Sequence, residues 1–335
     1  MKISASIYSS NRRDLIELIK ELDAYHIDYF HLDCNDDIKV FDDIRKIRSI
    51  SKTPIDLHLI SPKPEKYFNL IRDLNVEMVT IQYENVNDIP QTPSGIKAKF
   101  GLAIVSSTDI AVFDRVKDNF SFILFMATTP GKSGGEFNKE NFRKIRQFRA
   151  QYPSKKIHID GGINEELSFI LRNMGVYAVV TGSYLFKEKF IGSALLKLKS
   201  DNIKSRYTVG DFMLGKDEIP YLVEGEYDFI KVLQTIEDYK MGFTHIIKSD
   251  GTLEGIISNA DVRRSLLQHN YKNGSEYPSL IINKNPAIVR DTDTISEMLE
   301  YIKNLDFPVL FLPVIDKHGH LCGTVKFNNL IKGES

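Results

Sequence analysis

Phe30-His31-Leu32-Asp33 places a histidine and a carboxylate two residues apart in a short apolar run. Successive side chains of a β-strand point to opposite faces, so His31 and Asp33 face one way and Phe30 and Leu32 face the other. A single buried strand therefore brings two groups that can bind a metal to one place.

Two later stretches repeat this local pattern. Residues 56–59 bring His58 to the end of an apolar run, and residues 158–160 bring Asp160 to the end of another, just before a pair of glycines. Both runs have the length and composition of short strands. We therefore ask whether the three strands end at the same place.

Short apolar runs alternate with amphipathic segments from Lys2 to about Lys199. The predicted strands are 3–7, 29–33, 55–60, 78–82, 98–105, 122–126, 156–160 and 178–181. Eight strand–helix units in about 200 residues predict an α/β fold of the TIM (β/α)8 barrel type. An open doubly wound sheet is the alternative, because periodicity does not report closure. Pro90 and Pro93 predict that the helix after the fourth strand is short or absent.

Composition describes an ordinary globular protein of two domains. The 335 residues are 42% hydrophobic and 27% charged, with a net charge of -1, which favours neither nucleic acid nor a membrane surface as a partner. The two cysteines, Cys34 and Cys322, fall in different predicted domains, so we expect no structural disulfide. The N-terminus lacks the apolar run of a signal peptide, and we expect a cytoplasmic protein.

The chain changes character after the barrel segment, residues 1–199. We predict a linker at 200–206 and then an α+β module at 207–335 made of two repeats, about 207–272 and 273–333. Each repeat reads as a helix, two strands joined by a polar turn, and a second helix, which we place at 261–269 in the first repeat and 328–331 in the second. Gly255 and Gly323 occupy corresponding places. Neither repeat looks large enough to bury its apolar face alone, so we expect the two to pack on each other.

The polar groups at the strand ends suit a divalent metal. In a TIM barrel, functional groups gather at the C-terminal ends of the strands, and His31, Asp33, His58 and Asp160 all fall at or near such ends. Mixed nitrogen and oxygen ligands without thiolate favour Zn, Fe(II), Mn or Co. Each residue alone has an ordinary structural explanation, but the four together predict one metal site.

Glycines follow the last three barrel strands. Residues 129–135 after the sixth strand include Gly134, residues 161–162 after the seventh are Gly161 and Gly162, and Gly182 with Ser183 follows the eighth. Glycine lets backbone N–H groups approach an anion, and barrels commonly bind phosphate after strands seven and eight. Together these loops predict a phosphate site.

The order of these motifs resembles the ribulose-phosphate 3-epimerase family over the whole first domain. The resemblance implies an isomerase that interconverts ribulose 5-phosphate and xylulose 5-phosphate, or a related ketose phosphate, through an enediolate. It implies that Asp33 and Asp160 are the two acid/base groups and that these two bind the metal with His31 and His58. The residues it places around the substrate are Ser6, Asn35, Met126, Gly134, Gly161, Gly162, Gly182 and Ser183.

The chain departs from this family's pattern near the site. Asn35 stands where the family usually has methionine, and Gln82 stands where it usually has histidine. An amide can hydrogen-bond a hydroxyl that a thioether cannot, so Asn35 predicts an altered preference among ketose phosphates.

Residues 208–331 resemble a tandem CBS pair, similar to the pair appended to arabinose-5-phosphate isomerases, and the motif at 255–261 carries the resemblance. It implies that Ser258 and Asp261 bind the phosphate and ribose of an adenine nucleotide. The second repeat lacks the hydroxyl and the carboxylate at 326–329. The alternative is a dimerisation block, because a serine and an aspartate three residues apart also begin an ordinary helix.

Two functions from different classes therefore remain. The first is an epimerase with a regulatory or dimerising module, acting in pentose phosphate metabolism or in surface-sugar synthesis, and we expect a homo-oligomer. The second is a non-catalytic sensor in which a retired barrel binds phosphate and the CBS pair reports nucleotide level. Loss of one of the four metal-site residues would favour the sensor, and all four are present.

Overall fold

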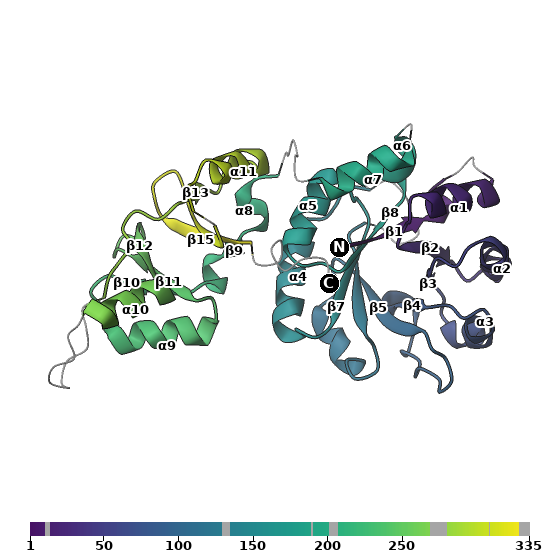
Figure 1. Cartoon of the computed structure of the whole chain (residues 1–335). Helices are drawn as coiled ribbons and strands as arrows, with labels where there is room; N and C mark the ends of the chain where they lie inside the picture. Colours follow the sequence, from purple (N-terminus) through teal and green to yellow (C-terminus); the bar gives the residue numbers. More distant parts are fainter. Residues whose placement is uncertain are drawn as a thin grey trace. The chain divides into compact units, whose positions relative to one another are not determined.

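The computed structural model describes residues 1–10, 14–128, 135–188, 190–200, 207–268, 280–307 and 309–327. The chain divides into two compact units, with the boundary after residue 201 (Figure 1). Within the described residues, no helix is both long and apolar enough to cross a membrane.

The first unit is a closed barrel of eight parallel strands in chain order. This confirms the predicted TIM barrel and excludes the open sheet. The strands are Lys2–Ser6 (β1), Tyr29–Cys34 (β2), Ile55–Leu59 (β3), Met78–Gln82 (β4), Lys99–Val105 (β5), Phe122–Met126 (β6), Lys156–Asp160 (β7) and Ala178–Thr181 (β8).

Helices surround the barrel, and the one expected after β4 is absent. The helices are Leu15–Ala24 (α1), Val40–Ile50 (α2), Phe68–Asp73 (α3), Glu140–Gln151 (α4), Glu165–Asn173 (α5), Ser183–Lys187 (α6) and Ile191–Lys199 (α7). Only a single 3-10 turn, Tyr83–Asn85, lies between β4 and β5, as the two prolines predicted. A 3-10 helix, Ile110–Arg115, connects β5 to β6.

Local sequence explains where these helices begin and what they bury. The side chain of Asp14 accepts hydrogen bonds from two backbone N–H groups of α1, and Asn164 caps α5 in the same manner. Such caps satisfy N–H groups that have no partner within the helix. In α2, Phe41, Ile44 and Ile47 recur at helical spacing and are fully buried.

The interior of the barrel is polar in one part and apolar in another. Ser4 of β1 donates a hydrogen bond to Asp56 of β3, so both side chains point inward across the barrel. The inward positions of β5, β6 and β8 instead form an apolar cluster that includes Leu124 and Val180. Buried polar groups are costly unless they are hydrogen-bonded, yet Oγ1 of Thr80 and Nε2 of His158 are buried here without a hydrogen-bond partner.

The second unit contains the two predicted repeats, each with a hairpin. In the first repeat the helix Phe229–Tyr239 (α9) precedes strands Phe243–Ile247 (β11) and Leu253–Ser258 (β12) and the helix Asn259–Gln268 (α10). In the second, Ile295–Lys303 (α11) precedes Phe311–Ile315 (β14) and Leu321–Lys326 (β15). The predicted helix at 328–331 lies outside the described residues.

Short strands that the sequence did not reveal complete the two sheets. Tyr221–Val223 (β10) pairs with β11, and Val289–Arg290 (β13) pairs with β14. Leu214–Gly215 (β9) lies near the start of the first repeat but pairs with β15 of the second, and it follows a short helix, Val209–Phe212 (α8). The chain therefore ties one repeat to the sheet of the other.

Contacts between side chains also join the two repeats. The rings of Phe243 and Phe311 stack with centroids 3.5 Å apart. His245 hydrogen-bonds the hydroxyl of Thr324 at 2.8 Å across the repeats. The expected packing of the two repeats into one module is thus observed.

Candidate functional site

The structure brings His31, Asp33, His58 and Asp160 together at the C-terminal ends of β2, β3 and β7. One ligand atom from each residue lies within 4.8 Å of all the others. The register of β2 and β3 sets Asp33 directly beside His58. Both imidazoles are fully buried, whereas the carboxylates of Asp33 and Asp160 keep 18% and 19% of their surface exposed. The carboxylates can therefore meet a ligand that enters from the rim.

His31 is held on one side and faces the cluster on the other. Its Nδ1 lies 2.9 Å from Oδ2 of Asp56, and Ser4 donates to the same oxygen at 2.8 Å. Its Nε2 lies 3.3 Å from Asp33 and 3.9 Å from Asp160. The sequence prediction gave Asp56 no role. Asp56 is two residues before His58 on β3, so the two side chains point to the same face.

His58 is held in a similar way by a different group. Its Nε2 lies 2.8 Å from Oε1 of Gln82, and its Nδ1 lies 3.1 Å from Oδ1 of Asp33. Gln82 is fully buried at the end of β4 and donates its amide N–H to Glu84. The sequence marked Gln82 only as a departure from a family pattern, and Glu84 was not anticipated.

The surroundings drive the pKa values of the two central carboxyl groups apart. Burial raises the pKa of Asp160 to about 6, opposed by His31 and helped by the charge of Asp33. Burial also acts to raise the pKa of Asp33, but the charges and hydrogen bonds of His31 and His58 outweigh it and lower that pKa well below its usual range. Carboxyl groups with such separated pKa values are suited to opposite acid and base roles.

The donor set fits a divalent metal. Two imidazole nitrogens and two carboxylate oxygens converge without thiolate, which suits Zn, Fe(II), Mn or Co. Each imidazole uses its other nitrogen to contact an acceptor, Asp56 or Gln82, as metal-binding histidines do in proteins. His31, Asp33, His58 and Asp160 are therefore the residues that could hold the ion.

Close backbone packing surrounds the glycines after β7 and β8. Gly161 has a φ of +108°, and a Cβ there would lie 2.2 Å from the hydroxyl of Thr128. At Gly182 a Cβ would lie 2.1 Å from the hydroxyl of Ser9, whose oxygen is 3.0 Å from that of Ser6. The ends of β1 and β8 are therefore adjacent, and Ser6 lies at this junction.

The remaining predicted substrate residues occupy the same end of the barrel. Gly162 follows Gly161 after β7, and Ser183 begins α6 directly after Gly182. Met126 is buried at the end of β6, whereas Asn35 is exposed immediately after β2. Gly134 lies outside the described residues.

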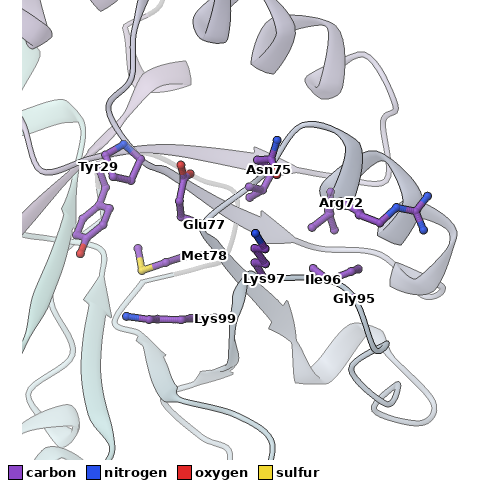
Figure 2. Close-up of a pocket in the computed structure, with 12 residues that line it drawn as sticks. Tyr29, Arg72, Asn75, Glu77, Met78, Gly95, Ile96, Lys97 and Lys99 are labelled. Carbon is purple, nitrogen blue, oxygen red and sulfur yellow. The ribbon is translucent and has the colours of Figure 1, made fainter.

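A separate cavity of about 470 Å³ lies at the start of β4 and β5. Figure 2 shows Met78 and Lys99 at the first positions of β4 and β5, together with Glu77 and Lys97 from the segments just before these strands. These positions are at the opposite end of the strands from Asp160 and Gln82. The cavity is therefore not part of the candidate site.

Ser258 and Asp261 contact each other at the start of α10. The backbone N–H of Ser258 donates to Asp261 at 2.8 Å, and the N–H of Asp261 lies 3.3 Å from the hydroxyl of Ser258. Arg264 donates to the second oxygen of Asp261. These are the reciprocal bonds of a helix capping box. Lys326 ends β15 at the corresponding position of the second repeat.

Family models match most of the first unit and part of the second. The model of the Ribulose-phosphate 3 epimerase family matches residues 2–186, and the model of the CBS domain matches residues 279–334. The ribulose-phosphate 3-epimerase of Helicobacter pylori (strain J99) is 27% identical over 203 residues, which cover 56% of this chain and 92% of that protein. The ribulose-phosphate 3-epimerase of Aquifex aeolicus is 30% identical over 161 residues, which cover 46% of this chain and 72% of that protein.

Solved structures also resemble part of this chain. The crystal structure of CBSX2 in complex with AMP is 23% identical and covers 38% of this chain and 94% of its own, with a TM-score of 0.32. The crystal structure of Hypoxic Response Protein I with two coordinated zinc ions is 19% identical. It covers 37% of this chain and 97% of its own, with a TM-score of 0.30.

Proposed function

The chain belongs to the ribulose-phosphate 3-epimerase family, whose members are isomerases, and on this premise we propose that its barrel epimerises a ketose phosphate at carbon 3. Ribulose 5-phosphate and xylulose 5-phosphate are the simplest substrate and product. One observation carries the proposal: Asp33 and Asp160 converge with His31 and His58 within 4.8 Å at the C-terminal end of the barrel.

The two carboxyl groups supply what the reaction needs. Inverting the carbon beside a ketone requires removal of a proton from one face and delivery of a proton to the other. His31 and His58 lower the pKa of Asp33 when no metal is bound, and a bound metal would supply that positive charge once both rings are neutral, so Asp33 is the base in one direction. Asp160, whose pKa burial raises to about 6, is the better proton donor. In the reverse direction the two residues exchange roles.

A divalent metal held by His31, Asp33, His58 and Asp160 would supply positive charge that stabilises negative charge developing on the substrate oxygens. The histidines keep their ring orientation because Asp56 and Gln82 hold the outer nitrogens. The fully buried rings also limit the access of water to this side of the site.

The rim residues would select the substrate. We assign the phosphate to the loops that contain Gly161, Gly162, Gly182 and Ser183, beside Ser6. Asn35 is exposed directly after the strand that carries Asp33, so its amide is available to a hydroxyl of the ketose. This position is our candidate for a preference that differs from that of the relatives.

The CBS domain would regulate or assemble the enzyme. We propose that Ser258 and Asp261 bind an adenine nucleotide, with Asp261 accepting from the ribose and Ser258 donating to a phosphate. The alternative function, a non-catalytic sensor, would not require all four of these residues, and their convergence within 4.8 Å supports the epimerase instead.

Proton exchange at the substrate carbon tests the epimerase. We expect deuterium from solvent to enter carbon 3 of at least one ketose phosphate in a panel followed by NMR. Chelation should stop the exchange, and addition of Zn, Fe(II), Mn or Co should restore it. Absence of exchange with every ketose phosphate, with metal present, would reject the enzyme in favour of the sensor.

A further inference from the structure

His58 contacts a different group at each of its two ring nitrogens. Its Nδ1 faces Asp33 and the rest of the metal cluster, whereas its Nε2 lies 2.8 Å from Oε1 of Gln82. A neutral imidazole carries its proton on only one nitrogen, and only the other nitrogen can bind a metal. The group that holds the proton therefore decides which nitrogen is the ligand.

Glu84 fixes the direction of the hydrogen bond that Gln82 makes. One carboxylate oxygen of Glu84 accepts from the backbone N–H of Val105 at 3.0 Å and from the hydroxyl of Thr108 at 2.5 Å, and the other oxygen accepts from Gln82. An ionised carboxylate only accepts, so Gln82 must present its amide N–H to Glu84. The amide oxygen of Gln82 is then left to face His58.

We propose that Glu84 and Gln82 are positioning residues that place the proton of His58 on Nε2 and so present Nδ1 to the metal. The inference rests on the proposed metal-dependent function and extends it to two residues that touch neither substrate nor metal. His31 has the opposite arrangement, because Asp56 accepts from its Nδ1 and leaves Nε2 toward the cluster. The two histidines thus offer different nitrogens.

The main chain after β5 holds this network in place. Lys144 is buried and donates to the carbonyl oxygens of Val105 and Ser106 at 3.0 Å each, and also to that of Thr108. The backbone N–H that donates to Glu84 therefore belongs to the last residue of β5, whose carbonyl oxygen Lys144 also binds. The series of hydrogen bonds from Val105 through Glu84 and Gln82 to His58 therefore begins at a backbone N–H. This group can only donate, so the direction of the series is fixed at that end.

Glu84→Gln tests the direction of these hydrogen bonds without changing the size of the side chain. The N–H of Val105 still needs an acceptor, so the new amide must turn its oxygen to Val105 and its N–H to Gln82. Gln82 then turns, donates to Nε2 of His58 and leaves the proton on Nδ1. We expect calorimetry with Zn²⁺ alone to show affinity about 10- to 100-fold weaker, the usual cost of losing the partner of a ligand. Nitrogen-15 NMR of the histidine side chains in the metal-free chain at pH 8 should show the proton of His58 on Nδ1.

Exchanging the two residues should restore the direction. In the double variant Gln82→Glu and Glu84→Gln, the carboxylate at 82 accepts from His58 and from the amide at 84. We expect zinc affinity to return to that of the wild type. Thr108→Val is the matched control, because it removes one bond to Glu84 without reversing the chain, and it should bind zinc as the wild type does.

The wild-type chain alone also tests the inference. In its Zn²⁺-loaded form, NMR should find the proton on Nε2 of His58 and on Nδ1 of His31. A proton on Nδ1 of His58, unchanged zinc affinity in Glu84→Gln, or no recovery in the exchanged variant would overturn the proposal. None of these measurements uses a substrate, so they stand apart from the outcome of the exchange experiment.

Discussion

The barrel site and the start of α10 in the second unit both contain carboxylates with close polar partners, but they differ in how these contacts arise. His31, Asp33, His58 and Asp160 come from three strands far apart in the chain and meet at one point. Ser258 and Asp261 are three residues apart and bond each other as a capping box. The start of a helix is enough to explain the capping box. It does not explain why four polar side chains from three strands meet at one point.

The histidines of the two units show the same contrast. His31 and His58 each use one nitrogen on a structural partner and direct the other toward the carboxylates. In the second unit, Nδ1 of His245 lies 2.7 Å from the carbonyl oxygen of Pro220, and Nε2 lies 2.8 Å from the hydroxyl of Thr324. His245 therefore has both nitrogens occupied by the protein. His31 and His58 instead face the carboxylate of Asp33, which is partly exposed at the rim.

Asp160→Asn should have the largest effect. Asparagine keeps the shape of the side chain but cannot carry the proton, so we expect the rate of exchange at the substrate carbon to fall about 10²- to 10⁴-fold. The rate is measured by NMR with saturating metal. Asp42→Asn on the surface of α2 is the control and should exchange at the wild-type rate. Exchange by Asp160→Asn at the rate of this control would remove Asp160 from the acid/base pair.

Asp261→Ala tests whether the capping box at the start of α10 also binds a nucleotide. We expect AMP binding to disappear in calorimetry and the free energy of unfolding to fall by about 1 kcal/mol from loss of the cap. Glu297→Ala is a matched control, since Thr294 and Glu297 form the same reciprocal bonds at the start of α11. It should cost similar stability in urea unfolding and leave AMP binding intact. If Asp261→Ala binds AMP as the control does, the capping box is only structural.

Sequence alone predicted the barrel and its central groups well. Each of the eight strands lies within one residue of its predicted ends, because alternation is a local signal. The convergence of His31, Asp33, His58 and Asp160 followed from the rule that barrel strands present functional groups at their C-terminal ends. The roles of Asp56 and Gln82 did not follow, because each depends on which neighbouring strand faces it.

The second unit was predicted less completely for a physical reason. The strands β9, β10 and β13 have two or three residues each, too few to show alternation. The pairing of β9 with the opposite repeat is a long-range choice that depends on the packing of both repeats. The repeats themselves were visible because their helices and hairpins are longer.

His245 provides the smallest test of the contrast between the two units. Burial lowers its pKa to about 4, so the folded chain resists a proton that the unfolded chain accepts near pH 6.5. The stability that this residue supports is complete above about pH 6.5 and is lost as pH falls toward 4. Between pH 7 and pH 5.5 the loss should be about 1 kcal/mol in urea unfolding.

A variant without this proton site should lose that part of the pH dependence. We expect His245→Gln to be less stable at pH 7, because glutamine fits the two partners poorly, yet to change less than the wild type between pH 7 and pH 5.5. His318→Gln, at an exposed turn, should keep the wild-type slope. Equal slopes for His245→Gln and the wild type would mean that His245 is protonated in the folded state, which the carbonyl of Pro220 and the hydroxyl of Thr324 could accommodate only if the hydroxyl turned to accept.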